Sequence, residues 1–109
     1  MKIQDVDFCV TDWDKLSPKE YLGETGKALW RTLEKGNIRV RIVEYSPGYL
    51  ADHLCSHGHV IYVLKGELIT ELKDGSVHVL KPGMSYQVAD DAAPHRSRTD
   101  IGAKLFVVD

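Results

Sequence analysis

The stretch VIYVLKGELITELKDGSVHVL, residues 60–80, decides the fold. It contains the apolar run 60–64 and two further short runs, 67–72 and 77–80, that are rich in apolar and β-branched side chains. Lys65-Gly66 and Lys73-Asp74-Gly75 separate these runs, and glycine in such short connections is typical of hairpin turns. The stretch therefore predicts three successive antiparallel strands.

The same pattern continues on both sides of this stretch. Upstream, residues 28–33 and 38–45 flank the turn Lys35-Gly36-Asn37, which predicts a further hairpin. Downstream, residues 84–88 and 104–108 have the pattern of two more short strands. Many short strands with turn signals between them indicate an all-β sandwich or barrel.

The chain of 109 residues is long enough for one domain with its own core. Residues 1–27 carry only a weak strand signal, around residues 3–10, and we expect them to form an N-terminal arm that packs on a barrel made by residues 28–109. Within the arm, Ser17-Pro18-Lys19-Glu20 matches the start of a helix. Because Gly23 and Gly26 follow closely, the arm is expected to hold at most one short helix.

Charge and hydropathy exclude several classes of partner. Fourteen basic and sixteen acidic residues give a net charge of -2, and no basic stripe stands out. This balance argues against binding to nucleic acid or to an anionic membrane surface. No apolar run approaches the length that crosses a bilayer, and the first nine residues do not resemble a signal peptide. We therefore expect a cytoplasmic protein.

The candidate functional residues gather just before residue 60. His53 and Cys55 are two positions apart, so in an extended chain they share one face. If the chain turns back at Ser56-His57-Gly58, His59 returns toward that pair, and His95 after a later turn-rich segment is the best candidate for a fourth donor. Thiolate and imidazole are donors that zinc favours. The sequence predicts a metal site at His53, Cys55, His59 and His95.

Other polar residues have a simpler interpretation. His57 falls in the expected turn and should point outward, and His78 is typical of a solvated strand residue. Arg39 and Arg41 share one strand face and could hold an anion, although arginines on a sheet face are more often solvated.

Two segments resemble the motifs of the cupin superfamily, small β-barrels of jelly-roll type. The first family motif is Gly-x5-His-x-His-x3-4-Glu-x6-Gly, and the chain matches it, with one residue fewer after the first glycine, at Gly48, His53, Cys55, His59 and Gly66. Cys55 stands in the place of the second histidine and His59 in that of the glutamate.

The second family motif, Gly-x5-Pro-x4-His-x3-Asn, is matched less completely. Gly83 and His95 correspond to its glycine and histidine with one extra residue between them, while Ala89 replaces the proline and Thr99 the asparagine. Within the superfamily, the chain resembles the small DHCW motif cupin fold proteins, although Leu54 replaces the aromatic residue between His53 and Cys55.

This resemblance implies a cupin barrel with one divalent metal inside, zinc being the first choice and nickel, iron or copper the alternatives. It also implies a homodimer. The barrel would bind a small molecule of unknown identity, with a cavity lined by Ile61, Val63, Met84 and Tyr86. Two classes of function stay open. The protein either binds a small molecule at the metal, with or without turnover, or is a non-catalytic binding or sensing module whose metal is structural.

Overall fold

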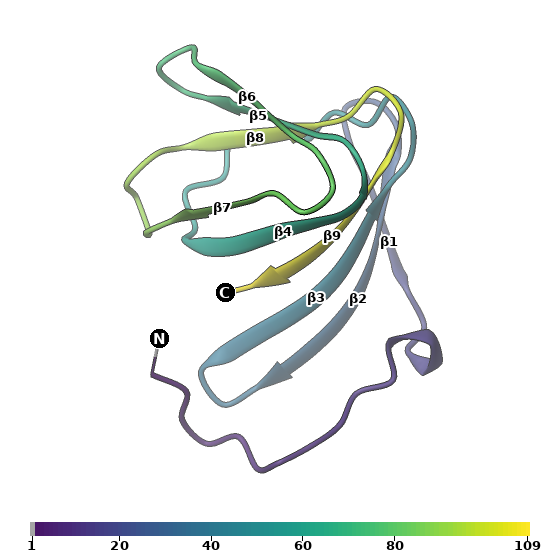
Figure 1. Ribbon diagram of the computed structural model, residues 1–109, viewed down its shortest axis with the longest axis vertical. Helices are drawn as coiled ribbons and strands as arrows, with labels where there is room; N and C mark the ends of the chain where they lie inside the picture. The colour runs from purple at the N-terminus through teal and green to yellow at the C-terminus, as the bar shows by residue number, and fades with distance from the viewer. Residues whose placement is uncertain (1) are drawn as a thin grey trace.

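The computed structural model describes residues 2–109, and its regular secondary structure is almost entirely β-strand (Figure 1). Its single helical turn within this range is the 3-10 helix η1, Trp13–Lys15. The strands are β1 Lys19–Leu22, β2 Lys27–Lys35, β3 Ile38–Tyr45, β4 His59–Gly66, β5 Leu68–Leu72, β6 Val77–Leu80, β7 Ser85–Val88, β8 His95–Arg98 and β9 Ala103–Val108. The predicted all-β fold with an N-terminal arm and at most one short helix is confirmed.

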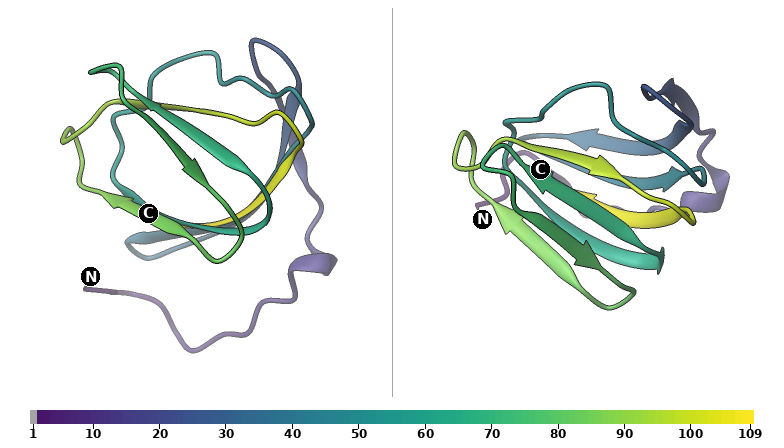
Figure 2. Two further views of the ribbon diagram at one scale, coloured as in Figure 1. Left: turned by 45° about the horizontal axis from the view of Figure 1, so that its top comes forward. Right: turned by 90° about the horizontal axis from the view of Figure 1, so that it is seen from above.

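The strands form two sheets that curve around a common interior, as in a jelly roll (Figure 2). The larger sheet has the order β1-β2-β3-β9-β4-β7, and the smaller sheet has the order β6-β5-β8. All strand pairs are antiparallel, and the β2–β3 and β5–β6 hairpins close at the predicted turns. No helix within residues 2–109 is long and apolar enough to cross a membrane.

Alternation of side chains fills the interior. Inward-facing residues of β3, β4, β5 and β9 form the core, among them Val43, Val63, Leu68 and Leu105, all at most 2% exposed. Trp30 from β2 packs against this cluster. Because successive side chains of a strand point to opposite faces, the same alternation determines which polar residues point into the barrel.

Two local predictions for the arm are wrong: residues 3–10 form no strand, and residues 19–22 form strand β1 where a helix was expected to start after Ser17. The backbone of β1 pairs with β2, with Lys19 opposite Trp30 and Leu22 opposite Lys27. The ring of Tyr21 lies 4.4 Å from the ring of Trp30. A free sheet edge supplies hydrogen-bond partners that outweigh the local helix signal.

Other parts of the arm cover the outer face of the larger sheet. The ring of Trp13 meets the ring of Phe106 edge to face at 6.5 Å, and the carbonyl of Leu16 accepts a hydrogen bond from Arg31 Nε at 3.1 Å. Ile42, which points to this outer side, is 7% exposed. The boundary between an arm of residues 1–27 and a barrel of residues 28–109 stays a proposal. The end of this arm contributes strand β1 to the edge of the larger sheet.

The connection between the two sheets depends on Gly66. Its φ is +74°, and a Cβ there would lie 2.0 Å from the carbonyl oxygen of Gly102. Gly66→Ala should therefore lower the free energy of unfolding by about 2 kcal/mol or more, because left-handed strain adds to a backbone clash. Gly75→Ala is the matched control, since its φ is +92° but no atom lies within 4 Å. Urea unfolding measures both, and equal losses would contradict the role of the clash.

The structure contains one chain, so the homodimer stays a prediction. Val60, Tyr62 and Leu64 project outward from β4 and are about 40% exposed, which makes this stripe the candidate contact face. Sedimentation should give twice the chain mass of 12.3 kDa. A species of the single chain mass at micromolar concentration would contradict the prediction.

Candidate metal centre

Residues 49–55 run beside β8 as an irregular fourth strand of the smaller sheet. The amide of Thr99 donates to the carbonyl of Tyr49 at 3.0 Å, and Ala51 donates to Ser97 at 3.0 Å. Cys55 and His95 exchange both backbone hydrogen bonds, at 2.7 and 3.0 Å. Residues directly opposite in an antiparallel pair project to the same face, with Cβ atoms about 5 Å apart. Cys55 and His95 therefore enter the barrel side by side.

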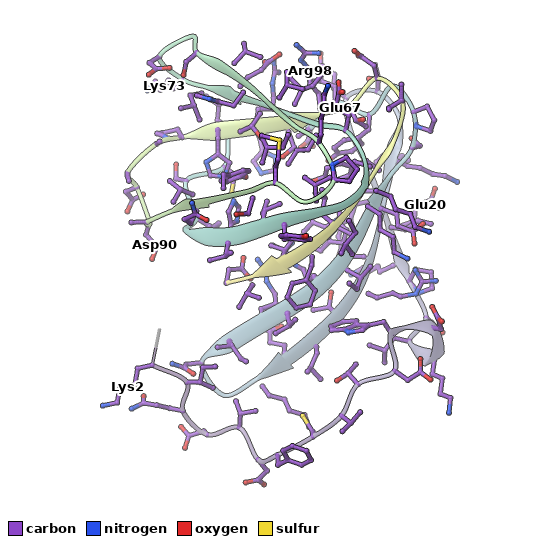
Figure 3. The ribbon with its side chains drawn as sticks, in the orientation of Figure 1. Lys2, Glu20, Glu67, Lys73, Asp90 and Arg98 are labelled. Atoms are coloured by element: carbon purple, nitrogen blue, oxygen red, sulfur yellow. The ribbon has the colours of Figure 1, made fainter. Side chains whose placement is uncertain are left out.

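The loop that follows Cys55 is fixed to the connection between β7 and β8. The amide of Gly58 donates to the carboxylate of Asp90, and the amide of Asp91 donates to the carbonyl of Ser56 at 2.8 Å. Figure 3 shows Asp90 beyond the end of β7, at the rim of the barrel. A Cβ at Gly58 would lie 2.6 Å from the amide nitrogen of Asp90, so glycine is required for this close approach.

His59 enters the same space from the larger sheet. It begins β4, and its side chain shares the inward face with Ile61 and Val63. His59 Nε2 lies 2.8 Å from His95 Nε2 and 3.0 Å from the hydroxyl oxygen of Tyr86. Two imidazole nitrogens from different sheets thus converge on one point inside the barrel.

The tautomer of His95 follows from its other ring nitrogen. His95 Nδ1 lies 2.7 Å from the carbonyl oxygen of Ala93, which can only accept, so Nδ1 carries the proton. In the neutral ring, Nε2 then presents its lone pair toward His59. A backbone carbonyl that fixes the distal nitrogen in this way is the usual support of a metal-binding histidine. His95 is 2% exposed, so its orientation is set by packing as well.

The second ring nitrogen of His59 is buried and has no hydrogen-bond partner among residues 2–109. The nearest acid is Asp109, whose Oδ2 lies 4.0 Å from His59 Nδ1. Burial, and then the charge of His95, lowers the pKa of His59 to about 4. His59 is therefore neutral near pH 7 and has a lone pair available for a metal. Without a metal, His59 Nε2 donates its proton to the His95 Nε2 lone pair at 2.8 Å. If a metal took both Nε2 lone pairs, the His59 proton would sit on Nδ1, which faces Asp109.

This shift predicts a pH dependence of the metal-free protein. Between the ordinary pKa of 6.5 and the folded value of about 4, the unfolded chain binds a proton at His59 that the folded chain does not. The free energy of unfolding should thus fall by on the order of 3 kcal/mol as the pH drops through this window. In His59→Gln the fall should be smaller by that amount, whereas the exposed His78→Gln should keep it. Urea unfolding from pH 4 to 7 tests both variants.

Beside the histidines, the sheet buries a group of charges that the sequence did not predict as a site. Arg39 donates to Asp109 through Nε and Nη2, at 3.0 and 2.8 Å, and Arg41 Nη2 donates to the same carboxylate at 3.1 Å. Burial raises the pKa of Asp109, but the hydrogen bonds and charges of the arginines outweigh it, so the pKa lies below its ordinary value. The expectation of solvated arginines is wrong for Arg41, which is 6% exposed.

The alternation of side chains along β3 could have predicted that Arg39 and Arg41 point into the barrel. Arg39 and Arg41 share their face with Val43 and Tyr45, both of which line the interior of the barrel. The cavity between the sheets has a volume of about 310 Å³. Its lining combines polar and apolar residues, namely Trp30, Arg39, Arg41, Val43, Tyr45, Tyr49, Ala51, His53, Cys55, His57, His59, Ile61, His95, Arg96, Ser97, Val107 and Asp109.

The four residues expected to line the cavity lie in different surroundings. Ile61 lines it directly, and Val63 is fully buried in the core below. Tyr86 is half-buried and reaches His59 through its hydroxyl group, and burial raises its pKa. Met84 is 47% exposed, and its sulfur lies 3.3 Å from the amide nitrogen of Lys81, outside the cavity.

The four predicted metal ligands are brought together only in part. His59 and His95 meet, and Cys55 lines the same cavity. His53 lies at the mouth, where its side chain is 75% exposed and its Nδ1 lies 2.6 Å from Asp52 Oδ1. His57 is exposed but also lines the rim of the cavity. Within residues 2–109, no three acidic, cysteine or histidine side chains converge closely enough to hold a metal as they stand.

No family model matches the chain, and no curated protein matches it significantly in sequence. Solved structures are similar to it at low sequence identity. A predicted oxalate decarboxylase from Thermotoga maritima is 15% identical, with 92% of this chain and 96% of that chain covered and a TM-score of 0.75. The Fe(II) form of HppE is 18% identical, with 98% and 62% covered and a TM-score of 0.75.

A cupin-like protein, also from Thermotoga maritima, is 20% identical, with 77% of this chain and 68% of that chain covered and a TM-score of 0.67. Together with the two-sheet topology, these similarities define the class: the chain has the cupin fold. The resemblance of the motifs around His53 and His95 to those of cupins is thereby confirmed at the level of the fold.

Proposed function

We propose that this cupin-fold protein holds one divalent metal between its two sheets and binds a small molecule in the adjoining cavity. The observation that carries the proposal is the convergence of His59 Nε2 and His95 Nε2 at 2.8 Å. Cys55, paired with His95 and facing the same cavity, supplies the third donor, and His53 at the mouth supplies the fourth.

The chemistry of the donors supports a metal of intermediate softness. Imidazole suits zinc, iron, nickel and copper, whereas a thiolate favours zinc. Zinc is therefore our first choice. Iron is the principal alternative, because HppE, which shares the fold, is known in an Fe(II) form. Cys9 and Cys55 are both free, and we propose a cytoplasmic location that keeps the Cys55 thiol available.

The cavity favours a binding role over a purely structural metal. A space of about 310 Å³ beside the histidines is at the small end of sites for small molecules. A metal there would act as a Lewis acid on a bound oxygen. The hydroxyl group of Tyr86, 3.0 Å from His59 Nε2, is placed to hydrogen-bond a ligand at the same point. The alternative is a binding or sensing module in which four protein donors saturate the metal.

Elemental analysis of the purified protein tests the proposal. Wild-type protein should contain close to one divalent metal per chain, and His59→Ala and His95→Ala should each lose most of it. His78→Ala is the matched control, because that side chain is exposed on β6 and lies 3.3 Å from Ser76 Oγ. Full metal content after both His59→Ala and His95→Ala would exclude this centre. A metal with an additional water or small molecule would favour a binding or catalytic role over the sensing module.

A further inference from the structure

Two residues that line the cavity each have a buried donor with no partner among residues 2–109. The donors are Nε of Arg41 and Nε1 of Trp30. The guanidinium carbon of Arg41 lies 4.3 Å from the centre of the Trp30 ring, so the two groups form one surface. Buried donors normally have acceptors, because an unpaired one costs about 1–3 kcal/mol. This surface is therefore suited to an acceptor from outside the protein.

The charges at this surface favour an acceptor that is an anion. Arg39 engages both oxygens of Asp109, so this single carboxylate serves two guanidinium groups. Glu34 also acts on Arg39 electrostatically, so within residues 2–109 Asp109 is the one carboxylate in contact with Arg41, whose side chain is 7% exposed. Burial lowers the pKa of Arg41, which is the direction expected for a cation with too little compensation. A ligand with one negative charge would give the buried Arg41 a second anionic partner.

We infer that the small molecule bound in this cavity is a carboxylate, with its oxygens on Arg41 Nε and Trp30 Nε1 and its apolar part against Val43, Ile61 and Val107. A planar carboxylate matches the guanidinium edge. The apolar residues of the lining suit an organic acid better than inorganic phosphate. The inference shares the cavity of the proposed function and names its ligand class, but the carboxylate site uses none of the proposed metal ligands.

Calorimetric titration of the protein as isolated tests this inference, with benzoate as the probe and benzamide and inorganic phosphate as comparisons. Benzoate should bind saturably, and benzamide should bind at least about 10-fold more weakly, because it has the same shape without the charge. Arg41→Gln should weaken benzoate binding about 10- to 100-fold, and Trp30→Phe about 5-fold. Arg31→Gln is the control, since Arg31 contacts Leu16 and Glu44 away from the cavity, and it should bind as wild type.

The outcomes separate this inference from the metal site. Equal binding of benzoate and benzamide, or tighter binding of phosphate, would overturn the inference in wild-type protein, without any variant having to fold. Benzoate binding that survives Arg41→Gln but is lost in His95→Ala would place the carboxylate on the metal and also overturn it. Discrimination by Arg41 in a protein that contains no metal would support the carboxylate site while removing the proposed metal centre.

Discussion

Chelation of the metal should lower the free energy of unfolding by about 4 kcal/mol when the starting free metal exceeds its dissociation constant a thousandfold. The size of the effect follows from the position of the donors. His59 belongs to the larger sheet. His95 belongs to the smaller sheet, and Cys55 belongs to the irregular fourth strand beside it. A metal bound to all three joins the sheets, and it binds only the folded chain. Thermal unfolding with and without a chelator measures the loss.

The histidine variants supply the control for this experiment. In His59→Ala and His95→Ala, the chelator should change the unfolding transition little, because the stabilisation is already absent. In His78→Ala the full effect should remain. A chelator effect of equal size in His95→Ala would mean that the metal binds elsewhere in the chain. Readdition of zinc should restore the stability of the wild type, which distinguishes metal loss from damage to the protein.

The sequence predicted the strands best where local signals agree. The β2–β3 and β5–β6 hairpins lie where the turns Lys35-Gly36-Asn37 and Lys73-Asp74-Gly75 separate apolar runs. β8 was missed because Arg96 and Arg98 break the apolar pattern. In the structure both arginines pair with Glu71 on the neighbouring strand β5, at 3.2 and 2.6 Å, so the strand is stabilised across the sheet by charge.

The candidate site could be predicted only in part, for a physical reason. Strand parity places Cys55 and His53 on one face, yet residues 52–54 lie in an irregular segment where the period of two does not hold. The pairing of Cys55 with His95 depends on contacts between residues 40 positions apart, which local pattern cannot show. Arg41 was assigned to solvent because arginine is usually exposed, and only the closed barrel, with the Asp109 carboxylate in contact with Arg41, explains its burial.

Replacement of Cys55 and of His57 tests which of these two cavity-lining residues binds the metal. Cys55→Ser should weaken zinc binding by more than about 100-fold, because it removes a thiolate donor, and changes to residues that merely support ligands already cost 10–100-fold. His57→Ala should change the affinity by less than about 3-fold, since His57 lies exposed at the rim and is not needed as a donor. Competition with a chromophoric chelator gives both affinities. In the cobalt-loaded protein, the thiolate-to-metal absorption should disappear in Cys55→Ser and persist in His57→Ala. Loss of metal in His57→Ala with retention in Cys55→Ser would place the third donor at residue 57 and show that the cupin alignment of this segment is wrong.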